Sequence, residues 1–167
     1  MATNFDDPRF TAFGLFAEAF TGLTNRFAVQ LEQHRLSSVE FEVLIRLARS
    51  PKRRLRMTDL AGQTSLSTSG VTRVVDRMDR EGLIRREACA SDRRSSYAVI
   101  TDDGLDRLDR VLPEHLELIE QWFISRLTPT QLEDMLNSLR VLRDAVNPCA
   151  TAGSNEPAEV PAEPQIA

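Results

Sequence analysis

Apolar residues recur at intervals of three and four along most of the chain, which is the spacing of one face of an α-helix. Long segments of this kind cover residues 10–33, 101–126 and 129–146. Another begins at Ser37, whose hydroxyl stands three residues before Glu40 in the arrangement of a capping box. We therefore predict a mainly α-helical fold.

The centre of the chain holds two short helical patterns separated by a cluster of Ser and Thr. The first opens at Thr58, and the second covers residues 68–80 and is followed by Gly82, a residue suited to the left-handed conformation that ends helices. The apolar face of the second pattern comprises Val71, Val74, Val75 and Met78, and the opposite face carries Arg73, Arg77 and Arg80. Two such helices joined by a polar turn form a helix-turn-helix.

Two strands are predicted directly after the second of these helices. Residues 83–89 and 97–100 have strand-like patterns and flank a polar, basic turn at residues 90–96. Residues 55–57 are expected to add a short third strand. The combination predicts a winged helix-turn-helix, in which a helix enters the major groove of DNA and a small antiparallel β-wing touches the backbone or minor groove.

These segments resemble the MarR family of bacterial transcriptional regulators. The resemblance extends from about Thr11 to Val146 and rests on four motifs that occur in the right order and spacing. They are SGVTRVVDRM at 69–78, EGLIRR at 81–86, SDRR at 91–94 and ITDDG at 100–104. The resemblance implies a homodimer that binds double-stranded DNA at a pseudo-palindromic operator.

Domain boundaries follow from the same patterns. Residues 1–36 and 102–146 are the predicted N- and C-terminal dimerisation helices, and residues 37–101 the predicted DNA-binding lobe. Residues 147–167 are rich in Pro, Ala and Glu and are expected to form a disordered tail. The first and last helices carry more apolar surface than one lobe covers, so a second copy is the natural partner, with a self-contained monomer as the alternative. Candidate residues for the dimer seam are Phe10, Phe13, Phe20, Leu136 and Leu139.

The net charge of −4 is unevenly distributed. Residues 52–94 hold eleven Lys and Arg against six Asp and Glu, whereas the rest of the chain holds ten against nineteen. Positive charge therefore gathers at the helix-turn-helix, as a surface facing phosphates requires. Two cysteines are too few for a disulfide framework, no apolar run approaches the ~20 residues of a membrane span, and the N-terminus lacks a signal peptide pattern. We expect a cytoplasmic bacterial protein, bound to the nucleoid through its operator and not to a membrane.

The candidate DNA contacts lie on the second helix and in the wing. Arg73 and Arg77 are predicted to contact base edges or phosphates, because a guanidinium can hold guanine O6 and N7 together. The alternative is a solvated face on which these arginines pair with Asp76, Asp79 or Glu81. The hydroxyl residues Ser67, Thr68, Ser69 and Thr72 at the front of the helix allow close approach to phosphate, with Ser67 also serving as the cap. In the wing, the resemblance implies that Arg94 enters the minor groove, positioned by Asp92 and flanked by Arg93; ordinary loop charges are the alternative.

A small aromatic or anionic effector is a possible further partner, expected where the first, second and fifth helices meet. His34, Arg46 and Trp122 are candidates for lining such a pocket, since they offer donors, a cation and a flat apolar wall. No metal or other cofactor is expected, because ligand-type residues do not cluster, and both His34 and His115 are expected at the surface or at a pocket edge. Cys89 is interpreted as a strand residue and Cys149 as part of the tail.

No enzyme is predicted, because the sequence has no nucleophile with its base, phosphate-binding glycine loop or dinucleotide fingerprint. The expected function is sequence-specific DNA binding by a transcriptional regulator, in the form of a repressor that a small molecule releases. A metal- or thiol-responsive regulator and a winged-helix module that binds protein remain as alternatives.

Overall fold

The computed structural model describes residues 6–89, 95–147 and 150. Its helices are α1 (Pro8–Gln33), α2 (Ser38–Arg49), α3 (Met57–Gln63), α4 (Thr68–Arg80), α5 (Asp102–Trp122) and α6 (Pro129–Val146). Its strands are β1 (Arg54–Arg56), β2 (Ile84–Ala88) and β3 (Ser96–Ile100), and the short 3-10 turns η2 (Pro51–Arg53) and η3 (Ile124–Arg126) complete the description. The predicted fold class, mainly helical with a small antiparallel sheet, is confirmed.

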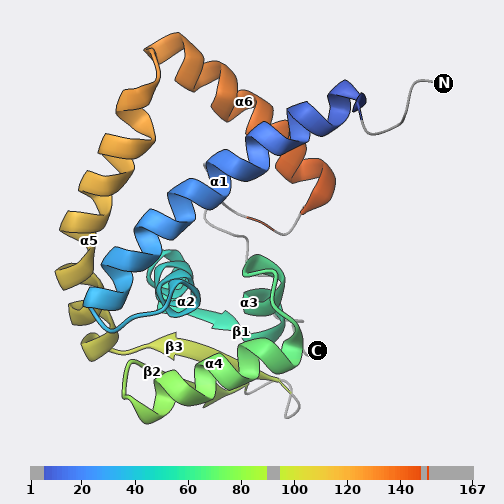
Figure 1. The fold of residues 1–167 in the computed structure, drawn as a ribbon. Helices are drawn as coiled ribbons and strands as arrows, with labels where there is room; N and C mark the ends of the chain where they lie inside the picture. The colour runs from blue at the N-terminus through green and yellow to red at the C-terminus, as the bar shows by residue number, and fades with distance from the viewer. Residues whose placement is uncertain (1–5, 90–94, 148–149, 151–167) are drawn as a thin grey trace.

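The elements divide between two ends of the molecule (Figure 1). The sheet, α3 and α4 lie at one end, while α6 and the start of α1 lie at the other, and the long helix α5 runs between them. The three strands are antiparallel in the order β1-β3-β2, so β1 is the third strand that the sequence predicts. Leu55 pairs with Ala98, and Ile84 with Ile100.

Local sequence signals fix the ends of several helices. Ser37 accepts a hydrogen bond from the Glu40 amide while the Glu40 carboxylate accepts from the Ser37 amide, so the predicted capping box forms. Gly82 has a φ of 76° and ends the turn after α4, as predicted. The predicted helix over 101–126 is instead α5 followed by the turn η3, because apolar spacing alone does not separate the last α-helical turn from a 3-10 turn.

The core lies in the half of the molecule that carries the sheet. Buried side chains from the end of α1, from α2, α3 and α4, from all three strands and from the first half of α5 form one cluster. In contrast, α6 buries none of its residues, and the first half of α1 exposes its phenylalanines. Within the described residues, no helix is long and apolar enough to cross a membrane.

Gly104 allows α5 to begin directly against the wing. A Cβ at this position would lie 2.3 Å from the Leu83 carbonyl oxygen and 2.7 Å from Ile100 Cγ1. The same joint is held by Thr101, whose amide donates to Leu83 O (3.1 Å) and whose hydroxyl donates to Gly82 O (2.6 Å). The start of α5 is thereby fixed to the end of the turn that follows α4.

Gly104→Ala is expected to lower the free energy of unfolding by about 1–3 kcal/mol, because the Leu83 backbone and the Ile100 side chain must move to admit the methyl group. Gly22→Ala is the matched control, since a Cβ there meets nothing within 4 Å and Ala favours the helix. Urea unfolding of both variants measures the difference. Equal free energies of unfolding in the two variants would mean that the structure around Gly104 admits a methyl group without a loss of stability.

His115 is buried, which corrects the expectation of a surface or pocket-edge position. Its ring lies between Phe27 and Phe41, with centroids 5.1 and 4.4 Å away, and its Nδ1 donates to Gln30 Oε1 at 3.0 Å. Gln30 is also buried, and its Nε2 donates to the Val111 carbonyl (3.3 Å). Sequence spacing does not reveal this site, because the residues that surround His115 belong to α1 and α2.

Burial lowers the pKa of His115 from its ordinary value of 6.5. As the pH falls from 6.5, the unfolded chain therefore binds a proton before the folded chain does, and stability falls with pH until the lowered pKa is passed. We expect the free energy of unfolding to decrease between pH 7.5 and 5.5, and the decrease to be smaller in His115→Gln. Urea titrations at both pH values test this. An equal decrease in the free energy of unfolding in wild type and His115→Gln would contradict it.

Candidate nucleic-acid interface

The helix α4 is anchored in the core along one face. Val71, Val75 and Met78 are fully buried, and Val74 is half-buried. With about 100° of rotation per residue, Arg73 then lies nearly opposite the buried face. The outward face of α4 is therefore free for a partner, at the end of the molecule away from α6 (Figure 1).

The first turn of α4 presents a row of hydroxyl groups. Ser67 caps the helix by accepting from the Gly70 amide at 3.0 Å, and its oxygen lies 3.1 Å from that of Ser69. The hydroxyl of Thr72 donates to the Thr68 carbonyl at 2.8 Å. The structure brings all four predicted hydroxyl residues together on an exposed surface, next to Arg73.

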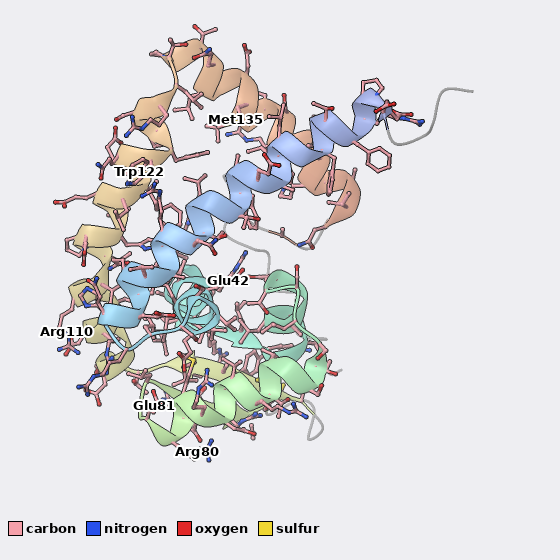
Figure 2. The ribbon with its side chains drawn as sticks, viewed as in Figure 1. Glu42, Arg80, Glu81, Arg110, Trp122 and Met135 are labelled. Carbon is pink, nitrogen blue, oxygen red and sulfur yellow. The ribbon has the colours of Figure 1, made fainter. Side chains whose placement is uncertain are left out.

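The three arginines of α4 have different surroundings. Within the described residues, Arg73 makes no hydrogen bond or ion pair, and it borders an open hollow with Asp76, Asp79 and Arg80. Arg80 Nε donates to the Asp76 carbonyl at 3.2 Å. Arg77 Nε donates to Glu40 Oε1 on α2 at 2.7 Å, so its partner is none of the acidic residues near it in sequence. Figure 2 shows Arg80 and Glu81 at the far end of α4, on the opposite side of the molecule from Met135 of α6.

The wing is attached to α4 by a second ion pair. Arg86 of β2 contacts Asp76 of α4 at 2.7 Å. The predicted wing contacts Asp92, Arg93 and Arg94 lie outside the described residues, so their roles stay predictions. At the base of the wing, Arg54 and Arg56 lie over the ring of Tyr97, at 4.5 and 5.7 Å from its centroid.

The three effector candidates have different partners in the structure. His34 contacts Glu114 of α5 at 3.0 Å, whereas Trp122 lies eight residues further along α5, about 12 Å by helical rise. The Trp122 ring is contacted by Arg26 and Arg126, at 3.7 and 4.8 Å from its centroid. Arg46 pairs with Glu42 on α2. The proposed pocket stays a prediction, and the α1–α2–α5 junction itself is occupied by the buried His115, which the sequence reasoning missed.

A hollow of about 370 Å³ lies at the bend between α1 and α2, and none of the three effector candidates lines it. Its lining residues are Ala28, Glu32, Arg35, Leu36, Ser37 and Ser38.

The described part of the chain gives no geometric support for a thiol-based or metal-binding site. Cys89, predicted as a strand residue, lies one residue past the end of β2 and is buried with Tyr97 and Val99. Cys149 lies outside the described residues. Within the described ranges, no group of three or more His, Cys, Asp or Glu is placed to hold a metal ion.

Sequence reasoning missed both ion pairs that hold α4. Glu40 was identified only as a capping residue, and Arg86 only as part of a motif. A glutamate at the third position of a helix is fully explained by capping, so nothing in its sequence context points to a partner on α4. Both ion pairs are visible only in the three-dimensional structure.

Comparison with known proteins places this geometry in a family. Residues 36–96 match the model of the MarR family. The uncharacterised HTH-type transcriptional regulator YkoM of Bacillus subtilis is 30% identical over 129 residues, which cover 77% of this chain and 81% of YkoM. The structure of Sco3205, a MarR family transcriptional regulator from Streptomyces coelicolor in complex with DNA, is similar with a TM-score of 0.78 and 34% identity, over 83% of this chain and 87% of Sco3205.

A second solved structure gives the same result. AbsC, a MarR family transcriptional regulator from Streptomyces coelicolor, matches with a TM-score of 0.78 and 31% identity, over 87% of this chain and 96% of AbsC. The members of this family are regulators of transcription and not enzymes. The winged helix-turn-helix built around α4 therefore belongs to a transcriptional regulator of the MarR family.

Proposed function

We propose that this protein is a repressor that binds a pseudo-palindromic DNA operator as a homodimer. The observation that carries the proposal is the outward face of α4, where exposed hydroxyl groups and Arg73, which has no ion pair among the described residues, lie opposite a fully buried apolar face. A helix of this kind fits the major groove, which presents a distinct pattern of donors and acceptors for each base pair. The relative Sco3205, whose structure contains DNA, supports this use of the fold.

The DNA contacts fall into two groups. Ser67, Thr68, Ser69 and Thr72 approach phosphate with their hydroxyls and with backbone amides of the first turn, which positions the helix without reading sequence. Arg73 reads base edges in the major groove, and Arg94 of the wing enters the minor groove. Residues 37–101 thus act as the reading lobe.

The dimer forms through α1 and α6. Exposed phenylalanines at Phe10, Phe13 and Phe20, with exposed fractions of 66, 70 and 59%, support this choice. The helix α6 buries none of its residues in the protomer, although Leu136 and Leu139 are half-buried. Two-fold symmetry then places the two recognition helices about one turn of DNA apart, ~10 base pairs between half-site centres.

A small aromatic or anionic effector releases the operator by preferring a dimer whose α4 helices have the wrong spacing. Its largest effect equals its difference in affinity for the two dimer states. His34, Arg46 and Trp122 are the residues to replace first in locating it.

Selection of duplexes from a random library tests the proposed function. The expected product is a pseudo-palindrome bound by two protomers, with half-sites separated by about one helical turn. Recovery of no enriched sequence, or of an asymmetric site bound by one protomer, would overturn the proposal.

A further inference from the structure

Arg77 is the only arginine of the described recognition helix that pairs with a carboxylate on another helix. Its Nε lies 2.7 Å from Glu40 Oε1, and its side chain is 48% exposed whereas that of Glu40 is 10% exposed. Four residues separate it from Arg73, which rotates it by about 40° around the helix, toward α2. Among the described residues, Arg77 therefore has an ion pair that Arg73 lacks.

The Glu40 carboxylate is held from both sides. Its Oε2 accepts from the Ser37 amide at 2.8 Å and from the Ser37 hydroxyl at 2.6 Å, while Oε1 accepts from Arg77. Burial by itself would raise the pKa of Glu40, but the hydrogen bonds from Ser37 and the charge and hydrogen bond of Arg77 outweigh it and lower the pKa. The carboxylate is charged at neutral pH and has no freedom to follow a moving arginine.

The residue before Arg77 on α4, Asp76, is held by the wing. Asp76 pairs with Arg86 of β2 at 2.7 Å, so consecutive residues connect α4 to α2 on one side and to the wing on the other. The apolar face of α4 fixes its depth in the core, whereas these two pairs oppose rotation and tilt. The orientation of Arg73 depends on that tilt.

We propose that Arg77 is a positioning residue of the operator-binding reaction, which acts through Glu40 to fix the orientation of the recognition helix. This inference rests on the proposed function, because orientation matters only if α4 reads DNA. A helix that is oriented before binding loses less conformational freedom on binding, and this increases affinity. The role differs from that of Arg73, which touches the bases itself.

The direction in which Glu40→Gln changes the affinity for DNA distinguishes this role from a direct DNA contact by Arg77. If Arg77 contacts phosphate, Glu40→Gln removes a nearby negative charge and raises affinity for DNA. If Arg77 acts through Glu40, the same change lowers affinity. Glutamine has one acceptor oxygen where the site uses two, so it can satisfy either Ser37 or Arg77 but not both.

The experiment measures binding to the selected operator by wild type, Glu40→Gln, Arg77→Gln and the double variant, at several salt concentrations. We expect each single variant to lose about tenfold in affinity and the double variant to lose no more than either, because all three remove the same joint. Preference should relax at every base pair that α4 reads. The slope of log affinity against log salt should stay within about 0.3 of wild type, whereas loss of a phosphate contact lowers it by roughly one.

Asp79→Asn is the matched charge control, since the Asp79 side chain is exposed on α4 and makes no hydrogen bond or ion pair with the described residues. It is expected to bind the operator as tightly as wild type or slightly more tightly. Melting curves confirm that each variant is folded at the assay temperature. If Glu40→Gln fails to fold, the salt slope of Arg77→Gln decides alone.

Higher or unchanged affinity in Glu40→Gln, additive losses in the double variant, or a slope reduced by one in Arg77→Gln would each overturn the inference while leaving the proposed function intact. Wild-type protein that binds no duplex specifically would overturn both.

Discussion

Replacing Phe13 and Phe20 by Asp is expected to convert the proposed dimer to a folded monomer and to weaken operator binding by about 10²–10⁴-fold. Both rings are exposed in the protomer, and they lie seven residues apart on one face of α1. Charges there would be buried without a partner in the dimer, yet they remain in water in the monomer. The affinity loss follows because dissociated protomers no longer hold a second DNA-binding lobe close to the second half-site.

Sedimentation and operator titration measure the two effects. Val29→Asp is the matched control, because Val29 has the same 59% exposed fraction as Phe20 but lies nine residues away, about half a turn around α1. It should remain dimeric. A double Asp variant that still sediments as a dimer would show that this face of α1 is not part of the dimer interface.

Arg73→Ala is expected to relax base preference at one or two positions in each half-site, at a cost of about 1–3 kcal/mol for the preferred bases. The structure leaves Arg73 exposed and without an ion pair among the described residues, so its removal leaves no buried partner unsatisfied. Other base pairs should be discriminated as before.

Arg94→Ala is expected to cost a similar 1–3 kcal/mol in a different pattern, because the loss should depend on A·T pairs under the wing. Asp92→Ala should produce a smaller loss of the same kind, since it frees the arginine instead of removing it. A panel of single-base operator variants at fixed salt measures both patterns. Uniform weakening across the panel would show that these arginines anchor to phosphates, with sequence read by the hydroxyl residues or by DNA shape.

Much of the fold could be predicted because its signals are local. The buried face of α4, the capping box at Ser37 and the left-handed turn at Gly82 each depend on residues within a few positions of one another. The wing strands and the short β1 were also predicted, with ends that differ by at most one residue. Periodicity and capping are properties of a single element, so the sequence displays them directly.

The candidate site was predicted only in part. The sequence identified the residues on the outer face of α4, since helical geometry separates them from the buried valines. It treated Arg73 and Arg77 alike, and it expected His115 at a surface or pocket edge. Arg77 and His115 both owe their surroundings to residues on other helices, which the sequence does not bring together.

The sequence by itself determined where each helix lies, apart from the 3-10 turn after α5, and which face of α4 is buried, because these follow from spacing along one element. Only the tertiary structure decided that Arg77 pairs with a glutamate 37 residues earlier while Arg73 has no such partner among the described residues, and that His115 lies among α1 and α2 side chains. The physical reason is that hydrogen bonds and burial depend on distances between elements, and those distances are set by the packing of the whole core.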